Sequence, residues 1–228
     1  MQELRLNKFL AEQLGLSRRE ADVAIQSGRV TINGKPAVLG QRLSIDKKDK
    51  VCYNGKIVPF SRDFIYLGLH KPVGYVCSRK SQDSTPTIYE LLPTKYQSLK
   101  TVGRLDKDSS GLILLTNDGD FNFQMTHPKF TKTKIYLVEL DHELEPLHQQ
   151  EISDFGIEIG DGVSRLGLER LDDARRKWRV TMSEGRNRQI RRTFAALGYT
   201  VIKLHRVQFG PYQLGDLKSG KFQEVPKA

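Results

Sequence analysis

The chain has 228 residues, enough for one large domain or for a small and a medium one. Its formal net charge is +10, and the charge is uneven: residues 1–60 carry +5, residues 61–164 carry −4 and residues 165–228 carry +9. Two basic ends around a mildly acidic middle favour a polyanion such as nucleic acid, held at two places. The chain has no signal peptide, no apolar run of membrane length and only two isolated cysteines, so we expect a cytoplasmic protein without a disulfide framework or zinc site.

The first 60 residues predict two short helices followed by a hairpin. A first helix is indicated by apolar residues at helical spacing before Gly15: Leu6, Phe9, Leu10 and Leu14. Ser17 and Glu20 form a capping box that opens a second helix, which ends near Gly28. This helix carries three residues toward the core: Ala21, Ala24 and Ile25. A strand then enters a turn at residues 33–34, an Asn-Gly pair typical of tight hairpins.

Residues 5–37, RLNKFLAEQLGLSRREADVAIQSGRVTINGKPA, resemble the alpha-L RNA-binding motif of the S-four type. The resemblance implies that Arg18, Arg19 and Arg29 contact RNA phosphates, which gives affinity and salt dependence but no base reading. The residues alone would also fit a basic helical hairpin without a ligand. We expect an RNA-binding domain over residues 1–58, a linker at 57–63 and a second domain over 64–228.

The second domain contains a polar loop between two apolar strands. Val102 ends one strand, residues 112–116 form the next, and Asp106 lies between them with Arg104 two residues before it. A carboxylate fixed between buried strands beside a cation suits a nucleophile or base. A plain surface turn is one alternative. A calcium loop is another, since Asp, Asp, Ser and Gly at 106, 108, 110 and 111 follow EF-hand spacing, although Asn117 stands where that loop needs Glu.

Four further elements follow from periodicity. Residues 134–140 predict a central strand with apolar residues on both faces, and residues 178–182 predict a half-buried strand. In the helix after residue 188, Ile190, Phe194 and Leu197 share one stripe. Arg188 and Arg192 would lie opposite this stripe, in solvent or on RNA, whereas Arg191 at its border could reach a carboxylate. Residues 201–207 predict a closing strand.

Residues 103–120, GRLDKDSSGLILLTNDGD, resemble the catalytic motif of the pseudouridine synthases, specifically the ribosomal small-subunit pseudouridine synthase A family and its large-subunit relatives. Three further stretches support the resemblance: 134–138, 184–192 and 201–207. An early stretch at 70–74 has His where the family's NKPxG pattern has Asn.

The family resemblance assigns a role to each matching residue. It implies that Asp106 is the catalytic residue and that Tyr136 lines the pocket beside it. It further implies an ion pair between Arg191 and Asp106, a uracil contact for Leu204, and Arg104 filling the space that the flipped nucleotide leaves. Asp106 could attack C1′ or abstract the neighbouring ribose proton.

The resemblance implies an α+β protein whose catalytic domain has a mixed, mostly antiparallel sheet. The reaction would be isomerisation of one uridine to pseudouridine in ribosomal RNA or a pre-ribosomal particle. Arg191 slightly favours large-subunit RNA. We expect a monomer that needs no cofactor, metal or membrane. The alternative is a non-catalytic RNA-binding or ribosome-assembly factor with the same fold.

Overall fold

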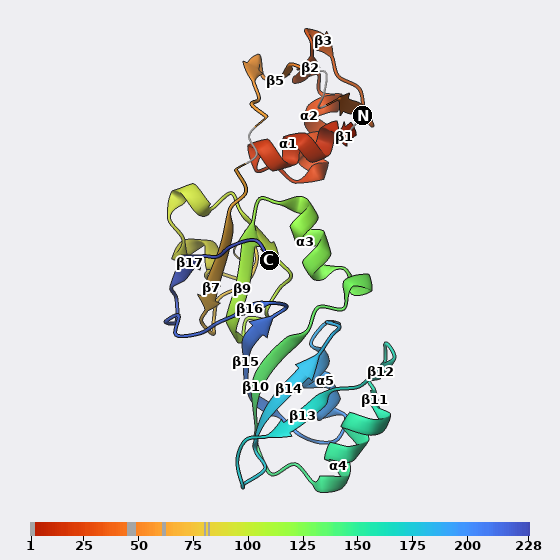
Figure 1. Cartoon of the computed structure of the whole chain (residues 1–228), viewed down its shortest axis with the longest axis vertical. Helices are drawn as coiled ribbons and strands as arrows, with labels where there is room; N and C mark the ends of the chain where they lie inside the picture. The colour runs from red at the N-terminus through yellow and green to blue at the C-terminus, as the bar shows by residue number, and fades with distance from the viewer. Residues whose placement is uncertain (1–2, 45–48, 61–62, 80, 82) are drawn as a thin grey trace. The chain divides into compact units, whose positions relative to one another are not determined.

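The computed structural model describes residues 3–44, 49–60, 63–79, 81 and 83–228 (Figure 1). The chain divides into two units, one formed by residues 1–65 with 117–119 and the other by 66–116 with 120–228. None of the helices in the described ranges is long and apolar enough to cross a membrane.

The first unit contains two short helices and small sheets. Its helices are α1 (Leu6–Leu14) and α2 (Arg18–Gln26). Its strands are β1 (Glu3–Arg5), β2 (Val30–Ile32), β3 (Lys35–Pro36), β4 (Arg42–Ser44), β5 (Val51–Tyr53) and β6 (Lys56–Ile57). Strand β1 pairs with β4, and the other four strands form a sheet in the order β3-β2-β5-β6.

Local signals of the sequence explain this unit. Gly15 ends α1 with a positive φ of 69°, and the capping box opens α2 because Glu20 N donates to Ser17 Oγ at 3.1 Å while Ser17 N donates to Glu20 Oε2 at 2.7 Å. The apolar stripes of both helices pack in one core with residues of the strands. Both predicted helices and the Asn-Gly hairpin are confirmed.

The predicted linker at 57–63 is only partly linker-like. Ile57 belongs to β6, and Val58 is 3% exposed within the core of the first unit, because its amide continues the hairpin by donating to Val51 O. Residues 61 and 62 of the predicted linker lie outside the described residues.

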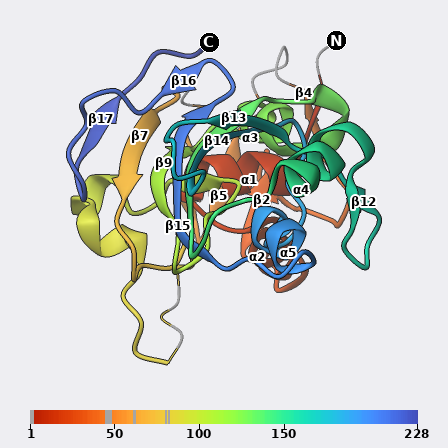
Figure 2. The ribbon, with the colours of Figure 1, turned by 90° about the horizontal axis from the view of Figure 1, so that it is seen from below.

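The second unit is built on one large sheet. Its principal strands are β7 (Tyr66–Lys71), β8 (Lys100–Val102), β9 (Ser110–Thr116), β10 (Lys134–Leu140), β13 (Gly167–Arg170), β14 (Lys177–Met182), β15 (Val201–Phe209), β16 (Tyr212–Gln213) and β17 (Phe222–Glu224). The order is β13-β14-β10-β15-β9-β7-β17, with β8 beside β9 and β16 beside β15. From below, β17, β7, β9 and β15 follow one another across the sheet (Figure 2).

Short helices and a hairpin complete this unit. They are α3 (Gly119–Thr126), α4 (Pro146–Gln150), α5 (Gln189–Ala195), η1 (Ile88–Leu91), η2 (Thr94–Tyr96), η3 (Pro128–Phe130), η4 (Glu151–Phe155), β11 (Ile157–Glu158) and β12 (Val163–Ser164). The strand predicted at 178–182 alternates as expected, with Trp178 and Val180 fully buried and Arg179 exposed. Strand β7 includes His70 and Lys71, the first two residues of the stretch at 70–74.

The predicted mixed, mostly antiparallel sheet is confirmed. Among the strand pairs of the described sheet, β9 and β15 are the parallel pair, with Gly111 opposite Arg206. Gly111 has a φ of +109°, and a Cβ there would lie only 2.6 Å from Arg206 N. Glycine is therefore required both by the backbone conformation and by the close approach of the two strands.

We predict that Gly111→Ala lowers the free energy of unfolding by at least about 2 kcal/mol, because backbone strain and strand collision add. Urea unfolding followed by the fluorescence of Trp178, the single tryptophan, measures this. Gly220→Ala is the control, since Gly220 has a φ of +76° but an added Cβ meets only Pro72 Cγ at 3.9 Å. Gly220→Ala should lower the free energy of unfolding by about 1 kcal/mol. Equal midpoints for the two variants would contradict the collision argument.

Candidate active site

The loop between β8 and β9 carries Asp106 and is fixed by its own backbone. Leu105 N donates to Cys77 Sγ at 3.4 Å, and Ser109 N donates to Asp106 O at 3.1 Å. Leu105 is buried, whereas the side chain of Asp106 is 32% exposed. The flanking elements are strands, so the loop does not have the helical frame of an EF-hand.

Lys71 supports this loop from within the protein. It is fully buried, and its Nζ donates to Ser109 O at 2.6 Å and to Pro72 O at 3.0 Å. Burial lowers the pKa of Lys71 to about 8, although its electrostatic interactions with Cys77, Asp106 and Asp108 act in the opposite direction. No role was predicted for Lys71 from the stretch at 70–74.

Asp106 forms its ion pair with Arg188. The Nη1 of Arg188 lies 3.5 Å from Asp106 Oδ2, and the same guanidinium donates two hydrogen bonds of 3.2 Å to the carboxylate of Asp108. Arg191 instead places its Nε 3.2 Å from Asp108 Oδ2 and donates to Val201 O at 2.6 Å. The predicted direct ion pair between Arg191 and Asp106 is therefore not formed, and Arg191 pairs with Asp108 instead.

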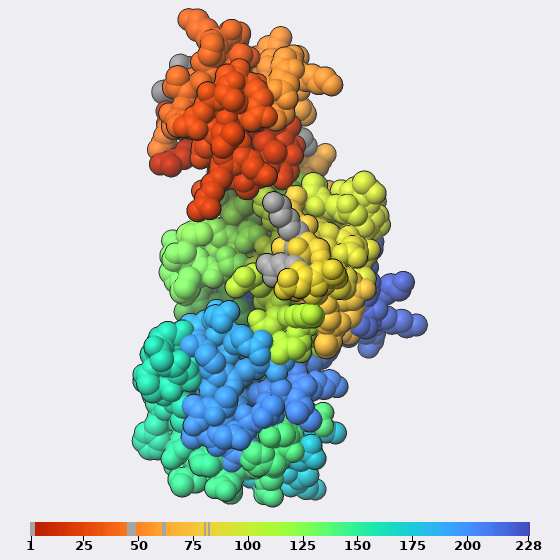
Figure 3. Space-filling view, turned by 180° about the vertical axis from the view of Figure 1, so that it is seen from behind, coloured from red at the N-terminus to blue at the C-terminus, as the bar shows by residue number. Residues whose placement is uncertain are grey.

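Arg188 is predicted to lie in solvent or on RNA, and the start of α5 explains why it reaches Asp106 as well. The prediction applied helical spacing from residue 188 onward, but the helix begins at Gln189. Arg188 precedes it in the left-handed region, with φ of 47° and ψ of 31°, so its side chain leaves the position that an ideal helix would give. Figure 3 shows the blue surface around α5 beside the yellow-green surface of the segment before β9.

The two arginines act on the carboxylate of Asp108. Burial alone would raise its pKa, but the hydrogen bond from Arg188 and the charges of Arg191 and Arg188 hold the pKa below its ordinary value. Asp108 thus remains an anion that holds both guanidiniums beside the loop of Asp106.

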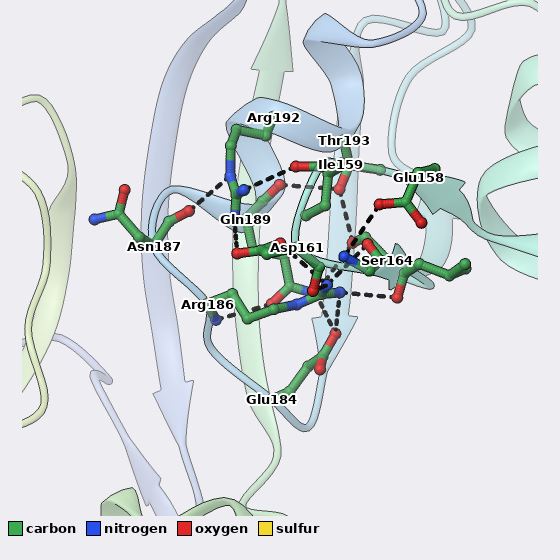
Figure 4. A network of polar contacts seen from close by, with 12 residues as sticks. Glu158, Ile159, Asp161, Ser164, Glu184, Arg186, Asn187, Gln189, Arg192 and Thr193 are labelled. Carbon is green, nitrogen blue, oxygen red and sulfur yellow. Dashed lines mark hydrogen bonds and ion pairs between the residues drawn. The ribbon is translucent and has the colours of Figure 1, made fainter.

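Arg192, whose side chain is 33% exposed, also has partners within the protein. Its Nη2 lies 2.8 Å from Asp161 Oδ2, and its Nη1 donates to Ile159 O at 2.9 Å (Figure 4). Arg186 reaches the same turn, with its Nη1 3.2 Å from Asp161 Oδ1 and its Nη2 2.9 Å from Glu184 Oε1. Arg192 thus stays partly in solvent, as predicted, while the turn between β11 and β12 supplies acceptors for its guanidinium.

Buried polar contacts tie α5 to β12 on the same side. Gln189 Nε2 donates to Ser164 Oγ at 3.0 Å, and Thr193 Oγ1 donates to Ser164 Oγ at 2.7 Å. All three side chains are buried. Together with the arginine contacts, they fix the segment that presents Arg188 and Arg191 (Figure 4).

A cavity of about 410 Å³ opens beside Asp106. Its lining includes four of the predicted site residues in addition to Asp106: Arg104, Tyr136, Arg188 and Leu204. Tyr136 on β10 and Leu204 on β15 are each 7% exposed, whereas Arg104 is exposed. A cavity of this size with apolar walls and a few polar groups is typical of a small-ligand site.

Arg206 is a cavity residue that the sequence analysis missed. It is 2% exposed and faces Tyr136 across the strand pair. Its Nε donates to Leu112 O at 2.8 Å, and its Nη1 donates to Tyr136 Oη at 3.5 Å. The sequence contained one signal for Arg206: it occupies a core-facing position in a strand whose other core-facing residues are apolar. A buried guanidinium at such a position requires a structural or ligand-binding reason.

In the first unit, the three predicted phosphate contacts are exposed. Arg18 and Arg19 lie in the first turn of α2 and Arg29 lies between α2 and β2. Arg29 donates to Ser27 Oγ at 2.8 Å, and its guanidinium lies 5.9 Å from the ring of Tyr53. None of the three forms an ion pair with a carboxylate among the residues that the structure describes.

Comparison with known proteins supports the two-part organisation. The sequence model of the RNA pseudouridylate synthase family matches residues 65–196, and that of the S4 domain matches residues 4–46. The chain is 38% identical over 226 residues to a ribosomal small subunit pseudouridine synthase A of Pasteurella multocida, covering 97% of this chain and 96% of that protein.

Further comparisons agree with these matches. The protein of the same name from Escherichia coli is 34% identical over 228 residues, covering 97% of this chain and 96% of that protein. A crystal structure of a pseudouridylate synthase superposes with a TM-score of 0.69 at 36% identity, covering 98% of this chain and 96% of that one. The chain therefore belongs to the RNA pseudouridine synthases, isomerases of the ribosomal small subunit pseudouridine synthase A family, and carries an N-terminal S4 domain.

Proposed function

We propose that the protein converts one specific uridine of ribosomal RNA to pseudouridine, and that its target lies in small-subunit RNA. The observation that carries the proposal is the half-exposed carboxylate of Asp106 at the wall of a cavity that Tyr136 and Leu204 also line. The names of the relatives from Pasteurella multocida and Escherichia coli support the small subunit. They do not support the slight preference for large-subunit RNA that we drew from Arg191.

The reaction requires no net oxidation or reduction. The N1–C1′ bond of the uridine breaks, the uracil turns within the cavity, and a C5–C1′ bond forms. C5 then loses its proton and N1 gains one, so that product and substrate have the same atoms. We propose a monomer that acts in the cytoplasm without a metal or cofactor, because the uracil itself leaves and rebonds.

Each of these cavity residues has its own role in the proposed reaction. Asp106, as an anion, attacks C1′ or abstracts the neighbouring ribose proton. Tyr136 stacks on the uracil or accepts the C5 proton, and Leu204 packs against the base. Arg104, exposed at the cavity, fills the space left by the flipped nucleotide and holds its phosphate.

Arg188 and Arg191 have different tasks in this proposal. Arg188 touches Asp106 but its side chain is 45% exposed, so water screens this ion pair. Arg191 is 12% exposed and holds Asp108 and the carbonyl of Val201, which makes it a positioning residue for the catalytic loop. Arg188 and Arg192, whose side chains are 45% and 33% exposed, present further guanidinium N–H groups to RNA phosphates.

The first prediction from the proposed function concerns Asp106. Asp106→Asn should abolish pseudouridine formation in a single-turnover assay on small-subunit RNA or nascent particles, because the amide is neither a nucleophile nor a base. RNA affinity should stay within about twofold, since the side chain is partly exposed and nearly isosteric. Pseudouridine is detected by chemical labelling and reverse transcription.

Two controls accompany the Asp106 variant. Asp173→Asn alters a fully exposed carboxylate and should keep wild-type activity. EDTA should leave the wild-type rate unchanged. Isomerisation by Asp106→Asn would refute the catalytic assignment. A wild-type protein inactive on every ribosomal RNA would favour the non-catalytic assembly factor.

The second prediction compares the two arginines. Arg191→Met should lower the single-turnover rate constant by about 10²- to 10³-fold, because the largely buried guanidinium of Arg191 holds both Asp108 and the carbonyl of Val201 beside the Asp106 loop. Arg191→Lys should retain more activity. Arg188→Met should lower the rate constant by about fivefold or less, because the side chain of Arg188 is more exposed than that of Arg191. A larger loss in Arg188→Met than in Arg191→Met would contradict the positioning role.

The third prediction concerns the S4 domain. The double variant Arg18→Gln, Arg19→Gln should weaken RNA binding and reduce the slope of log affinity against log salt by about 0.7 to 0.9 per lost phosphate contact. The rate constant at saturating RNA should not change. Arg42→Gln is the control, because Arg42 already pairs with Glu3 at 3.3 Å. An unchanged slope in the double variant would refute these phosphate contacts.

A further inference from the structure

A cluster of aromatic rings lies on the surface of the catalytic unit, at the end of α3. The ring centroid of His127 is 4.6 Å from that of Phe123 and 6.4 Å from that of Phe130. Phe123 is 47% exposed, and His127 is also exposed. Rings that stay in contact with water are available to a ligand that stacks on them.

A lysine covers two of these rings. The Nζ of Lys129 lies 4.7 Å from the ring centroid of Phe130 and 5.4 Å from that of Phe123. Neither Lys129 nor the nearby Lys132 forms an ion pair with a carboxylate in the described ranges of the chain. We call the five residues Phe123, His127, Lys129, Phe130 and Lys132 the aromatic–lysine patch.

The local fold holds the patch in place. His127 caps the short helix η3, because its Nδ1 accepts a hydrogen bond from Lys129 N at 3.3 Å. Phe130 N donates to His127 O, and Thr131, with a φ of 42°, turns the chain toward β10. The rings therefore sit on a compact turn of the backbone, which reduces the entropy cost of binding.

The patch is continuous with the catalytic cavity. Two of its members, His127 and Lys132, line the cavity, as does Pro128 between them. A chain that places one nucleotide beside Asp106 must continue across the neighbouring surface on at least one side. The aromatic–lysine patch is such a surface, and it combines stacking faces with cations.

We propose that the aromatic–lysine patch binds the single-stranded RNA that flanks the target uridine. Phe123 and His127 stack on an unpaired base next to the target, while Lys129 and Lys132 contact its phosphates. An RNA strand fits better than a protein partner, because the exposed rings are surrounded by cations without paired carboxylates. The inference rests on the proposed function and adds a contact for the neighbouring nucleotides.

The test measures binding and chemistry separately, with a fluorescein-labelled small-subunit RNA fragment that the wild-type protein modifies. Phe123→Ala should raise the Kd by about 5- to 150-fold, the range expected for losing one stacked base. Its single-turnover rate constant at saturating RNA should stay within about twofold. Phe123→Tyr should restore wild-type affinity, because it keeps the ring. Lys129→Gln should reduce the salt slope by about 0.7.

Phe155→Ala is the matched control, since Phe155 is 70% exposed and is not among the residues that line the cavity. It should leave the Kd unchanged. A Kd for Phe123→Ala equal to that of Phe155→Ala, on RNA that the wild type still modifies, would overturn this inference alone. Failure of the wild type to form pseudouridine on any ribosomal RNA would instead overturn the proposed function.

Discussion

The close approach of β9 and β15 at Gly111 is the constraint on which the active site depends. This parallel pair joins two parts of the chain: the loop of Asp106 directly precedes β9, and α5 precedes β15. Because Gly111 has no side chain, the backbone of Arg206 can lie against it. The pairing of β10 with β15 then places Arg206 opposite Tyr136, so β15 links the strand that follows the Asp106 loop to the cavity wall that Tyr136 lines.

Beside this strand pair, Asp106 shares the cation Arg188 with Asp108. Asp108 takes two hydrogen bonds from Arg188 and the ion pair of Arg191, whereas Asp106 has one contact of 3.5 Å with Arg188. A carboxylate whose lone pairs accept several guanidinium hydrogen bonds is a poor nucleophile. Asp108 therefore holds both arginines and leaves the carboxylate of Asp106 accessible from the cavity.

Much of this arrangement could be predicted from the sequence, because local signals determined it. The capping box of α2, the alternation of β14 and the Asp106 loop all depend on neighbouring residues. The partners of the arginines could not be predicted in this way. Helical spacing did not predict the position of the Arg188 side chain, because Arg188 precedes the helix. Arg192 pairs with Asp161, which lies in a hairpin about 30 residues earlier in the chain. Long-range pairing decides both contacts.

Two lysines of the catalytic unit, Lys71 and Lys134, are buried enough to disfavour their charged forms. Burial lowers the pKa of Lys134 to about 8, helped by the charge of Arg206 and opposed by that of Glu184, and the fully buried Lys71 has a similar pKa. Such shifts show that holding these groups as cations is costly in the free protein. For Lys134, which lines the cavity, a bound phosphate would favour the charged form and offset part of that cost. Lys71 is fully buried, so the acceptors that stabilise its charged form are carbonyl oxygens of the protein, those of Ser109 and Pro72.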